Sequence, residues 1–154
     1  MRGRSTGAGS ADSERLARPA GHRSVPHTAD LRIEAWGPTR ERCFAEAVQA
    51  VTGTFVDLTD ATGTTLRSTV IRADRDEDLL VALLEEIVYR LDTAGEVPVE
   101  VGLTAVPGGL EAAFHCAAVG SLPQTGAAPK AVTLHGLACD RGPEGWSCSV
   151  TLDV

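Results

Sequence analysis

The stretch DRDEDLLVALLEEIVYRLD, residues 74–92, carries the clearest structural pattern in this chain. Its apolar residues recur at the three- and four-residue spacing of a single helix face. They are Leu80, Leu83, Leu84, Ile87, Val88 and Leu91. Asp74 and Glu77 have the spacing of a capping box, and further aspartates add negative charge at the positive end of the helix dipole. We expect a helix from Glu77 to Asp92, roughly 24 Å long and able to cover a sheet.

A strand and a second helix precede this stretch. Apolar and polar residues alternate over residues 31–36, which is the period of a half-buried strand. Thr39 can cap a helix over residues 40–52, and Gly53 can end it. A further strand is expected over residues 64–73.

Only strand patterns follow the long helix. Alternation over residues 97–105 and 110–116, with a Pro-Gly-Gly turn between them, indicates a hairpin. Residues 130–138 and 146–154 form a last pair. The order β-α-β-α-β-β-β-β predicts an α+β fold: a two-layer sandwich with two helices packed on one face of a mixed, largely antiparallel six-stranded sheet.

Length and composition predict one globular unit with a basic leader. The chain has 154 residues, of which 43% are hydrophobic and 23% charged, as in ordinary globular domains. We expect a disordered basic tail over residues 1–20 and a single domain over residues 21–154. The tail could touch RNA or be a solvated leader. No run approaches the ~20 apolar residues of a membrane span, and the tail lacks a secretory core, so we expect a cytoplasmic protein without a membrane partner.

Charge and cysteine content exclude some classes of function. With 21 acidic and 14 basic residues, the net charge of −7 argues against a protein that clamps nucleic acid by itself. The only lysine is Lys130. None of the cysteines has the spacing of a zinc ribbon or a redox motif, and each sits in an apolar pattern, which predicts reduced, structural thiols. They are Cys43, Cys116, Cys139 and Cys148.

Two features near the ends of the chain carry candidate chemistry. Asp153 lies on the outward face of the last strand, next to the terminal carboxylate of Val154. Two adjacent negative charges repel each other unless a cation neutralises them, although a frayed, solvated terminus is the alternative. The tetrapeptide HTAD, residues 27–30, precedes the first strand, where it could also be an ordinary turn.

Together with the segments between them, these features resemble the archease family. HTAD at residues 27–30 matches the opening motif of that family, and DLLVALLEEIVY at residues 78–89 is similar to its long helix. KAVTLHG at residues 130–136 resembles its K-A-V-T-Y-H-G strand, and LDV at residues 152–154 matches its closing motif. The resemblance covers residues 21–154.

Four positions depart from the family pattern, while the acidic motifs at both ends are intact. Leu83 and Glu85 replace a frequent tryptophan and asparagine in the helix. Leu134 replaces the tyrosine of the K-A-V-T-Y-H strand, and Pro129 stands where valine is usual.

The resemblance implies a small accessory protein, not an enzyme, with no catalytic residues of its own. Archeases assist the GTP-dependent tRNA-splicing RNA ligase by promoting its guanylylation and its multiple turnover. The expected partner is therefore this ligase, and RNA is met only indirectly.

The resemblance also implies a metal site. The family builds it from the aspartate of H-T-A-D, the penultimate aspartate and the C-terminal residue, which here are Asp30, Asp153 and Val154. Oxygen donors without thiolate or imidazole select a hard divalent cation such as Ca²⁺ or Mg²⁺. These residues can meet if the first and last strands lie side by side.

The roles of three nearby residues stay open at this point. His27 could orient Asp30 or enter the active site of the partner. Lys130 and His135 could face the ligase or its phosphates, or be a solvated charge and an ordinary strand histidine.

Two other classes of function remain as alternatives. A metal-dependent hydrolase could hold Mg²⁺ with Asp30 and Asp153, but the chain has no G-x-S-x-G motif, no P-loop and no histidine pair at ligand spacing. A general chaperone-like binder would act on unrelated clients and would not depend on Asp153. We therefore favour the accessory role.

Overall fold

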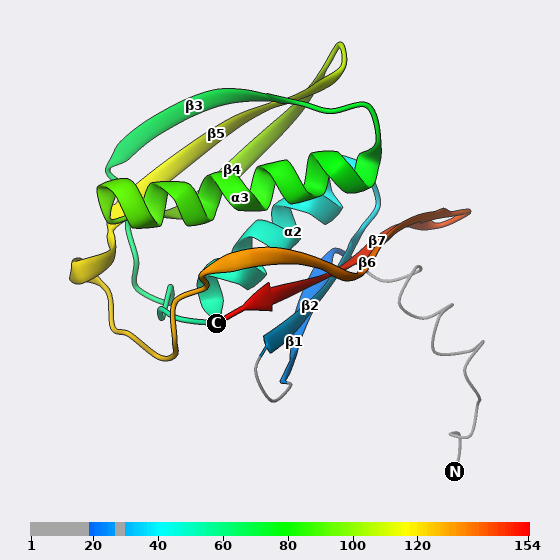
Figure 1. Cartoon of the computed structure of the whole chain (residues 1–154). Coiled ribbons are helices and arrows are strands. Elements are labelled where there is room, and N and C mark those ends of the chain that lie inside the picture. Colours follow the sequence, from blue (N-terminus) through cyan, green and yellow to red (C-terminus); the bar gives the residue numbers. More distant parts are fainter. Residues whose placement is uncertain (1–18, 27–29) are drawn as a thin grey trace.

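A computed structural model of the chain describes residues 19–26 and 30–154 (Figure 1). Most of the tail expected over residues 1–20 lies outside the described residues, and so does His27. Within the described part, no helix is both long and apolar enough to cross a membrane.

The described elements confirm the α+β class. They are β1 (Gly21–Pro26), β2 (Asp30–Gly37), α2 (Arg40–Gly53), β3 (Thr65–Arg72), α3 (Asp76–Ala94), β4 (Glu96–Val106), β5 (Gly109–Ala118), a 3-10 turn (Val119–Ser121), β6 (Ala131–Gly142) and β7 (Gly145–Asp153). The strand missing from the expected order is β1. Its sequence, GHRSVP, has no apolar alternation, and it forms the edge of a sheet by pairing only with β2 among the described strands.

The strands form two sheets where one six-stranded sheet was expected. One sheet has the order β1-β2-β7-β6 and the other has the order β3-β5-β4. Every described strand pair is antiparallel, so the sheets are not mixed. In Figure 1 the helices lie between the two sheets, and α2 contacts strands of both. This arrangement follows from the wide apolar face of α2, which buries seven of its residues and needs cover on more than one side.

The start of α2 follows the expectation, and its end lies within one residue of it. Thr39 is the N-cap, and its hydroxyl accepts a hydrogen bond from the Arg42 amide at 3.1 Å. The helix runs through Gly53 and is capped by Thr54 in a right-handed conformation. The helix thus ends at the predicted glycine, although no left-handed residue caps it.

The predicted capping box of α3 is wrong. Its N-cap is Arg75, which makes no side-chain cap bond, so the helix starts one position later than the Asp74–Glu77 spacing requires. The carboxylate of Asp76, in the first turn, instead forms an ion pair with Arg40 of α2. Arg40 Nη1 and Asp76 Oδ1 are 2.9 Å apart. Acidic residues still complement the helix dipole there, and Gly95 ends the helix in the left-handed conformation (φ 64°).

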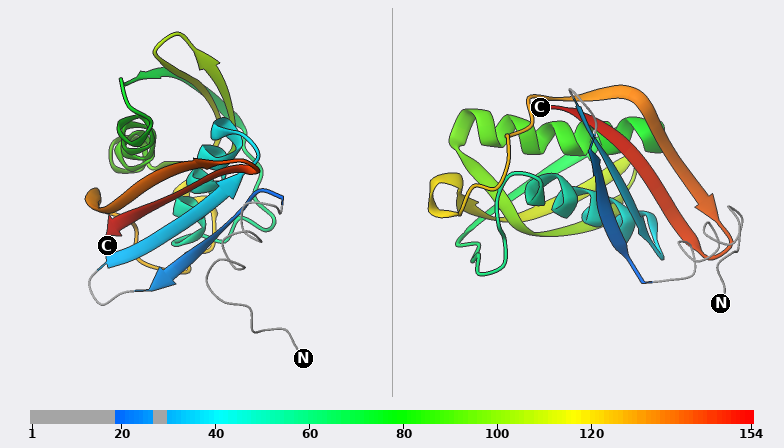
Figure 2. Two further views of the ribbon diagram at one scale, coloured as in Figure 1. Left: turned by 90° about the vertical axis from the view of Figure 1, so that its right-hand side faces the viewer. Right: turned by 90° about the horizontal axis from the view of Figure 1, so that it is seen from below.

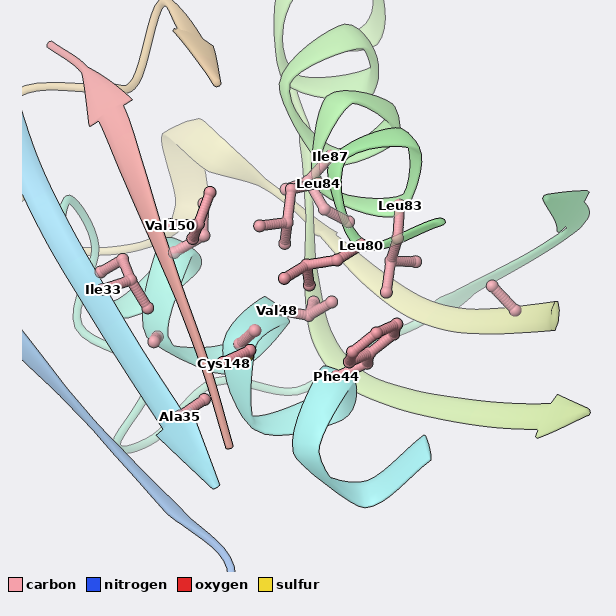
Figure 3. Close-up of a cluster of buried hydrophobic side chains, with 14 of the residues drawn as sticks. Ile33, Ala35, Phe44, Val48, Leu80, Leu83, Leu84, Ile87, Cys148 and Val150 are labelled. Carbon is pink, nitrogen blue, oxygen red and sulfur yellow. The ribbon is translucent and has the colours of Figure 1, made fainter. Parts of the chain in front are cut away.

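The core joins both helices to both sheets. Figure 3 shows Phe44 and Val48 of α2 among the leucines of α3 and beside Ile33 of β2 and Val150 of β7. All of these side chains are buried. Because the core takes the odd-numbered residues of β2 and the even-numbered residues of β7, the alternate residues of both strands lie on the outer face of their sheet.

The cysteines are free, as expected, and three of them are buried. The Sγ atoms of Cys43 and Cys148 lie 3.5 Å apart in the core. Cys139 is half-buried and pairs in register with Cys148. Burial raises the pKa of the Cys139 thiol to about 12, and the negative charge of neighbouring groups acts in the same direction.

This shift predicts an alkaline loss of stability. An unfolded cysteine has a pKa of about 8.5, so between that pH and about pH 12 the unfolded chain loses a proton that folded Cys139 keeps. The stabilisation of the folded state by the protonated Cys139 thiol is complete below the pKa of the unfolded chain. It is lost as the pH rises from about 8.5 toward about 12. In urea denaturation at pH 7 and pH 10, Cys139→Ala should therefore lose less of its free energy of unfolding than the wild-type chain. Equal losses in the two proteins would contradict the assignment.

Candidate metal centre

Strands β2 and β7 bring the two ends of the domain together. They pair antiparallel with Asp30 directly opposite Asp153, and Figure 2 shows β7 between β2 and β6. Side chains directly opposite each other share one face of a sheet, with Cβ atoms roughly 4.5–5.5 Å apart. Asp30 is half-buried and Asp153 is exposed. The two aspartates expected from the sequence therefore face the same side at one end of the sheet.

The core fixes this register. Ile33 lies opposite Val150, and both are fully buried. A slip of one residue would move these side chains to the outer face, so burial specifies the pairing strongly. The Lys130 amide donates to the Asp153 carbonyl at 2.7 Å and holds the end of β7. The side chain of Val154 packs against the core and so continues the alternation of the strand.

A bulge in β6 covers part of the outer face. Thr133 pairs with Thr151 and Ala138 with Ser149, so β6 advances five positions while β7 advances two. Gly136, within the extra residues, adopts a left-handed conformation (φ 71°) that favours glycine. Its carbonyl accepts a hydrogen bond from the Ser149 hydroxyl at 2.9 Å. This contact ties the bulge to the centre of the sheet.

The bulge and the strand pair border a small open cavity beside Asp30, and Asp153 is not part of its lining. It has a volume of about 200 Å³ and is lined by Asp30, Arg32, His135, Gly136 and Thr151. His135 and Asp30, which belong to two motifs far apart in the sequence, thus border one space. The exposed side chain of Lys130 is not part of this lining, and His27 lies outside the described residues.

Sequence reasoning missed Arg32 and Thr151. Strand alternation places each of them on the same face as an aspartate two positions away, and the glycine inside β6 is a known signal of a bulge. What the sequence could not supply is the partner of each strand, which brings these positions together.

The charges around the cavity are unevenly paired. Glu34 has two arginine partners, with Arg23 Nε at 3.0 Å and Arg32 Nη2 at 3.2 Å. Within residues 19–26 and 30–154, no basic side chain forms an ion pair with Asp30 or Asp153. The aspartate pair therefore presents two negative charges that the described side chains leave uncompensated.

The comparison with known families covers almost the whole described chain. Residues 22–154 match the archease protein family (MTH1598/TM1083). The chain belongs to the archease family.

Relatives and solved structures agree with this membership. The chain is 53% identical over 135 residues to the probable protein archease of Mycobacterium tuberculosis H37Rv, covering 88% of this chain and 75% of that protein. It is 30% identical over 142 residues to the protein archease of Methanosarcina barkeri, covering 84% and 93%.

Two solved structures share the fold. The solution structure of protein 1598 from Methanobacterium thermoautotrophicum aligns with a TM-score of 0.71 and 23% identity, covering 87% of this chain and 99% of that one. The crystal structure of an archease, possible chaperone, from Thermotoga maritima aligns with a TM-score of 0.63 and 19% identity, covering 86% and 96%. At these identities the likeness concerns the fold alone.

The family resemblance implies a donor set for a hard cation. In the described part of the chain, no three histidine, cysteine, aspartate or glutamate side chains are grouped so as to hold a metal. The set expected from the family resemblance needs only two such side chains, Asp30 and Asp153, with the carboxylate of Val154 as the third donor. All of these donors are oxygens, which Ca²⁺ and Mg²⁺ prefer.

Proposed function

We propose that this archease family member is a metal-binding accessory protein that activates a GTP-dependent tRNA-splicing RNA ligase in the cytoplasm. In this role it promotes guanylylation of the ligase and its multiple turnover, and it meets RNA only through the ligase. The observation that carries the proposal is the placement of Asp30 directly opposite Asp153 at the end of β7, in a chain of this family.

The geometry supports a single cation between the two carboxylates. Cβ atoms roughly 5 Å apart let two carboxylates reach one ion at metal–oxygen distances of about 2.0–2.6 Å. The repulsion between like charges is then replaced by attraction to the ion. In the proposal, the carboxylate of Val154 supplies a third oxygen beside Asp153.

The site is also accessible to a protein partner. Asp153 and His135 are exposed, and Asp30 is half-buried, so a bound cation would lie at the surface of the sheet. The net charge of −7 favours a protein partner over direct binding to RNA. A cation displayed in this way could be delivered to, or repositioned in, the nucleotide site of the ligase.

Two other functions make different predictions. A metal-dependent hydrolase would process RNA or nucleotide without any partner, whereas an accessory protein would leave both unchanged. A chaperone-like role, which the name of the Thermotoga maritima structure suggests for that protein, predicts effects on unrelated clients that do not depend on Asp153.

The decisive measurement is ligation by the cognate ligase under single- and multiple-turnover conditions. Adding the wild-type protein should raise the number of turnovers, and Asp30→Asn or Asp153→Asn should reduce that gain at least tenfold, because each removes a charged donor. Asp60→Asn is the matched control, since Asp60 is exposed on a loop outside the site. Stimulation that is absent, or that survives both substitutions, would refute the proposal.

A further inference from the structure

The cavity beside Asp30 is lined by hydrogen-bond donors as well as by this carboxylate. Its lining includes the guanidinium-bearing Arg32, the imidazole of His135 and the hydroxyl-bearing Thr151. A guanidinium and a neutral imidazole each offer N–H donors, and a hydroxyl offers an O–H donor. Three different donors therefore border the same space as the carboxylate of Asp30.

Arg32 has donor capacity to spare. One of its terminal nitrogens lies 3.2 Å from Glu34, but Glu34 also pairs with Arg23 at 3.0 Å. A guanidinium carries five N–H donors, so a single ion pair leaves most of them available. Arginine also matches the geometry of a phosphate with two parallel hydrogen bonds.

The spacing along the sheet relates Arg32 to the cation site. Arg32 lies opposite Thr151, one same-face step along the strands from the Asp30–Asp153 pair. That step is about 7 Å, because each residue advances roughly 3.4 Å. Arg32 and Asp30 both line the cavity, so a phosphate held there could contact a cation ligated by Asp30 and also accept hydrogen bonds from the guanidinium.

The size and charge of the cavity limit what can enter it. With a volume of about 200 Å³, the cavity is large enough to admit a phosphate group. Asp30 alone would repel an anion, so a phosphate is favoured only when the cation is also present. A phosphate monoester carries a charge of about −1.5 to −2 at pH 7, so its attraction to the cation is stronger than that of a singly charged diester.

From this geometry we propose that Arg32, His135 and Thr151 form a subsite for a terminal phosphate group bound to the divalent cation at Asp30 and Asp153. The subsite rests on the proposed function, since it needs the cation. It extends that function by assigning the site a substrate class: a cation-bound phosphate monoester. The phosphate could come from a nucleotide or from the end of an RNA strand, and both present the same chemistry.

Calorimetry can test the subsite without the ligase. Inorganic phosphate, GMP and a dinucleotide with only a phosphodiester are titrated into the full chain, with saturating Mg²⁺ and with EDTA. Phosphate and GMP should bind at least tenfold more tightly with Mg²⁺ than with EDTA. The dinucleotide should bind more weakly than either of them under both conditions. An oligonucleotide with a 3′-terminal phosphate, compared with GMP, distinguishes an RNA end from a nucleotide.

Arg32→Gln should weaken phosphate binding at least tenfold, since bonds to charged groups are the strong ones. Glu34 keeps Arg23 as its partner, so the change leaves that charge paired. The affinity for Mg²⁺ alone should stay the same or rise, because a positive charge near the cation has been removed. Arg42→Gln is the control, since Arg42 is exposed on α2 and does not line this cavity.

The outcomes separate the subsite from the cation site. The subsite alone is overturned if the chain binds Mg²⁺ normally but Arg32→Gln leaves the phosphate affinity unchanged. It is also overturned if the phosphate affinity is the same in Mg²⁺ and in EDTA. Binding of the diester as tight as that of GMP overturns the assignment to a monoester. Failure of the wild-type chain to bind Mg²⁺ or Ca²⁺ overturns the cation site and the subsite together.

Discussion

Replacing Asp30 or Asp153 by asparagine should weaken the affinity for Ca²⁺ or Mg²⁺ by roughly 100-fold or more. The two aspartates lie directly opposite each other in the register of β2 and β7, and each substitution removes a full charge from the proposed site. Changes in groups that merely support metal ligands cost about 10–100-fold in affinity, so loss of a direct ligand should exceed that range. Calorimetric titration of each variant measures the effect.

The same substitutions should have the opposite effect on the cation-free protein. Like charges directly opposite each other in a sheet destabilise it by a few tenths of a kcal/mol to about 1 kcal/mol, so either variant should be as stable as the wild type, or slightly more stable, in EDTA. At a cation concentration 100 times Kd, the wild type should gain about 2.7 kcal/mol and the variants almost nothing. Variants that are less stable in EDTA, or that bind normally, would contradict a shared cation site.

The third proposed donor can be tested in the same assay. Adding residues after Val154 displaces the carboxylate from that position and leaves both aspartates in place. Weaker cation binding is expected, with unchanged thermal stability in EDTA. Unaltered affinity would remove Val154 from the proposed ligand set.

Phe44→Ala should lower the free energy of unfolding by about 3–5 kcal/mol. Phe44 is fully buried and lies between α2 and the leucines of α3, where its removal leaves a cavity. For a chain of this size the loss corresponds to a fall in Tm of roughly 6–20 °C. Because total stabilities are about 5–15 kcal/mol, the variant would be close to unfolding at 37 °C.

A surface aromatic provides the comparison for this substitution. Tyr89 lies on α3 with 61% of its surface exposed, so Tyr89→Ala should change stability by no more than about 0.5 kcal/mol. Urea denaturation of both variants decides the matter. A loss below 1 kcal/mol for Phe44→Ala would mean that the core does not join the helices and sheets as described.

Much of the fold could be predicted from local patterns. The apolar spacing of residues 80–91 identified α3, Thr39 marked the start of α2, and the alternation in β7 placed Asp153 on the outer face. The capping box was wrong because the helix begins at Asp76, with Arg75 as its N-cap and no side-chain cap bond. Asp76 pairs with Arg40, a contact over 36 positions that no local pattern shows. Strand β1 was missed because an edge strand needs no apolar alternation once its neighbour supplies the hydrogen bonds.

The candidate site was predictable in its parts and not in its assembly. The aspartates were identified from motifs at the two ends of the domain, and the structure places them opposite each other. The approach of His135 to Asp30 depends on the bulge in β6, and Gly136 was the only local sign of that bulge. Arg32 was missed because the residues near it in the sequence do not show which strand pairs with β2.

By itself, the amino-acid sequence determined α2, α3 and the described strands other than β1, and which face of each is apolar, because these periods depend on residues within one or two turns. The tertiary structure decided that the strands divide into two sheets around the helices, that β2 pairs with β7 and that β6 bulges over the cavity. The pairing of β2 with β7 joins segments more than 100 residues apart, and the second sheet pairs β3 with β5 across an intervening helix and strand; no local pattern records such contacts. The cavity lined by Asp30, Arg32 and His135 requires both the pairing of β2 with β7 and the bulge in β6.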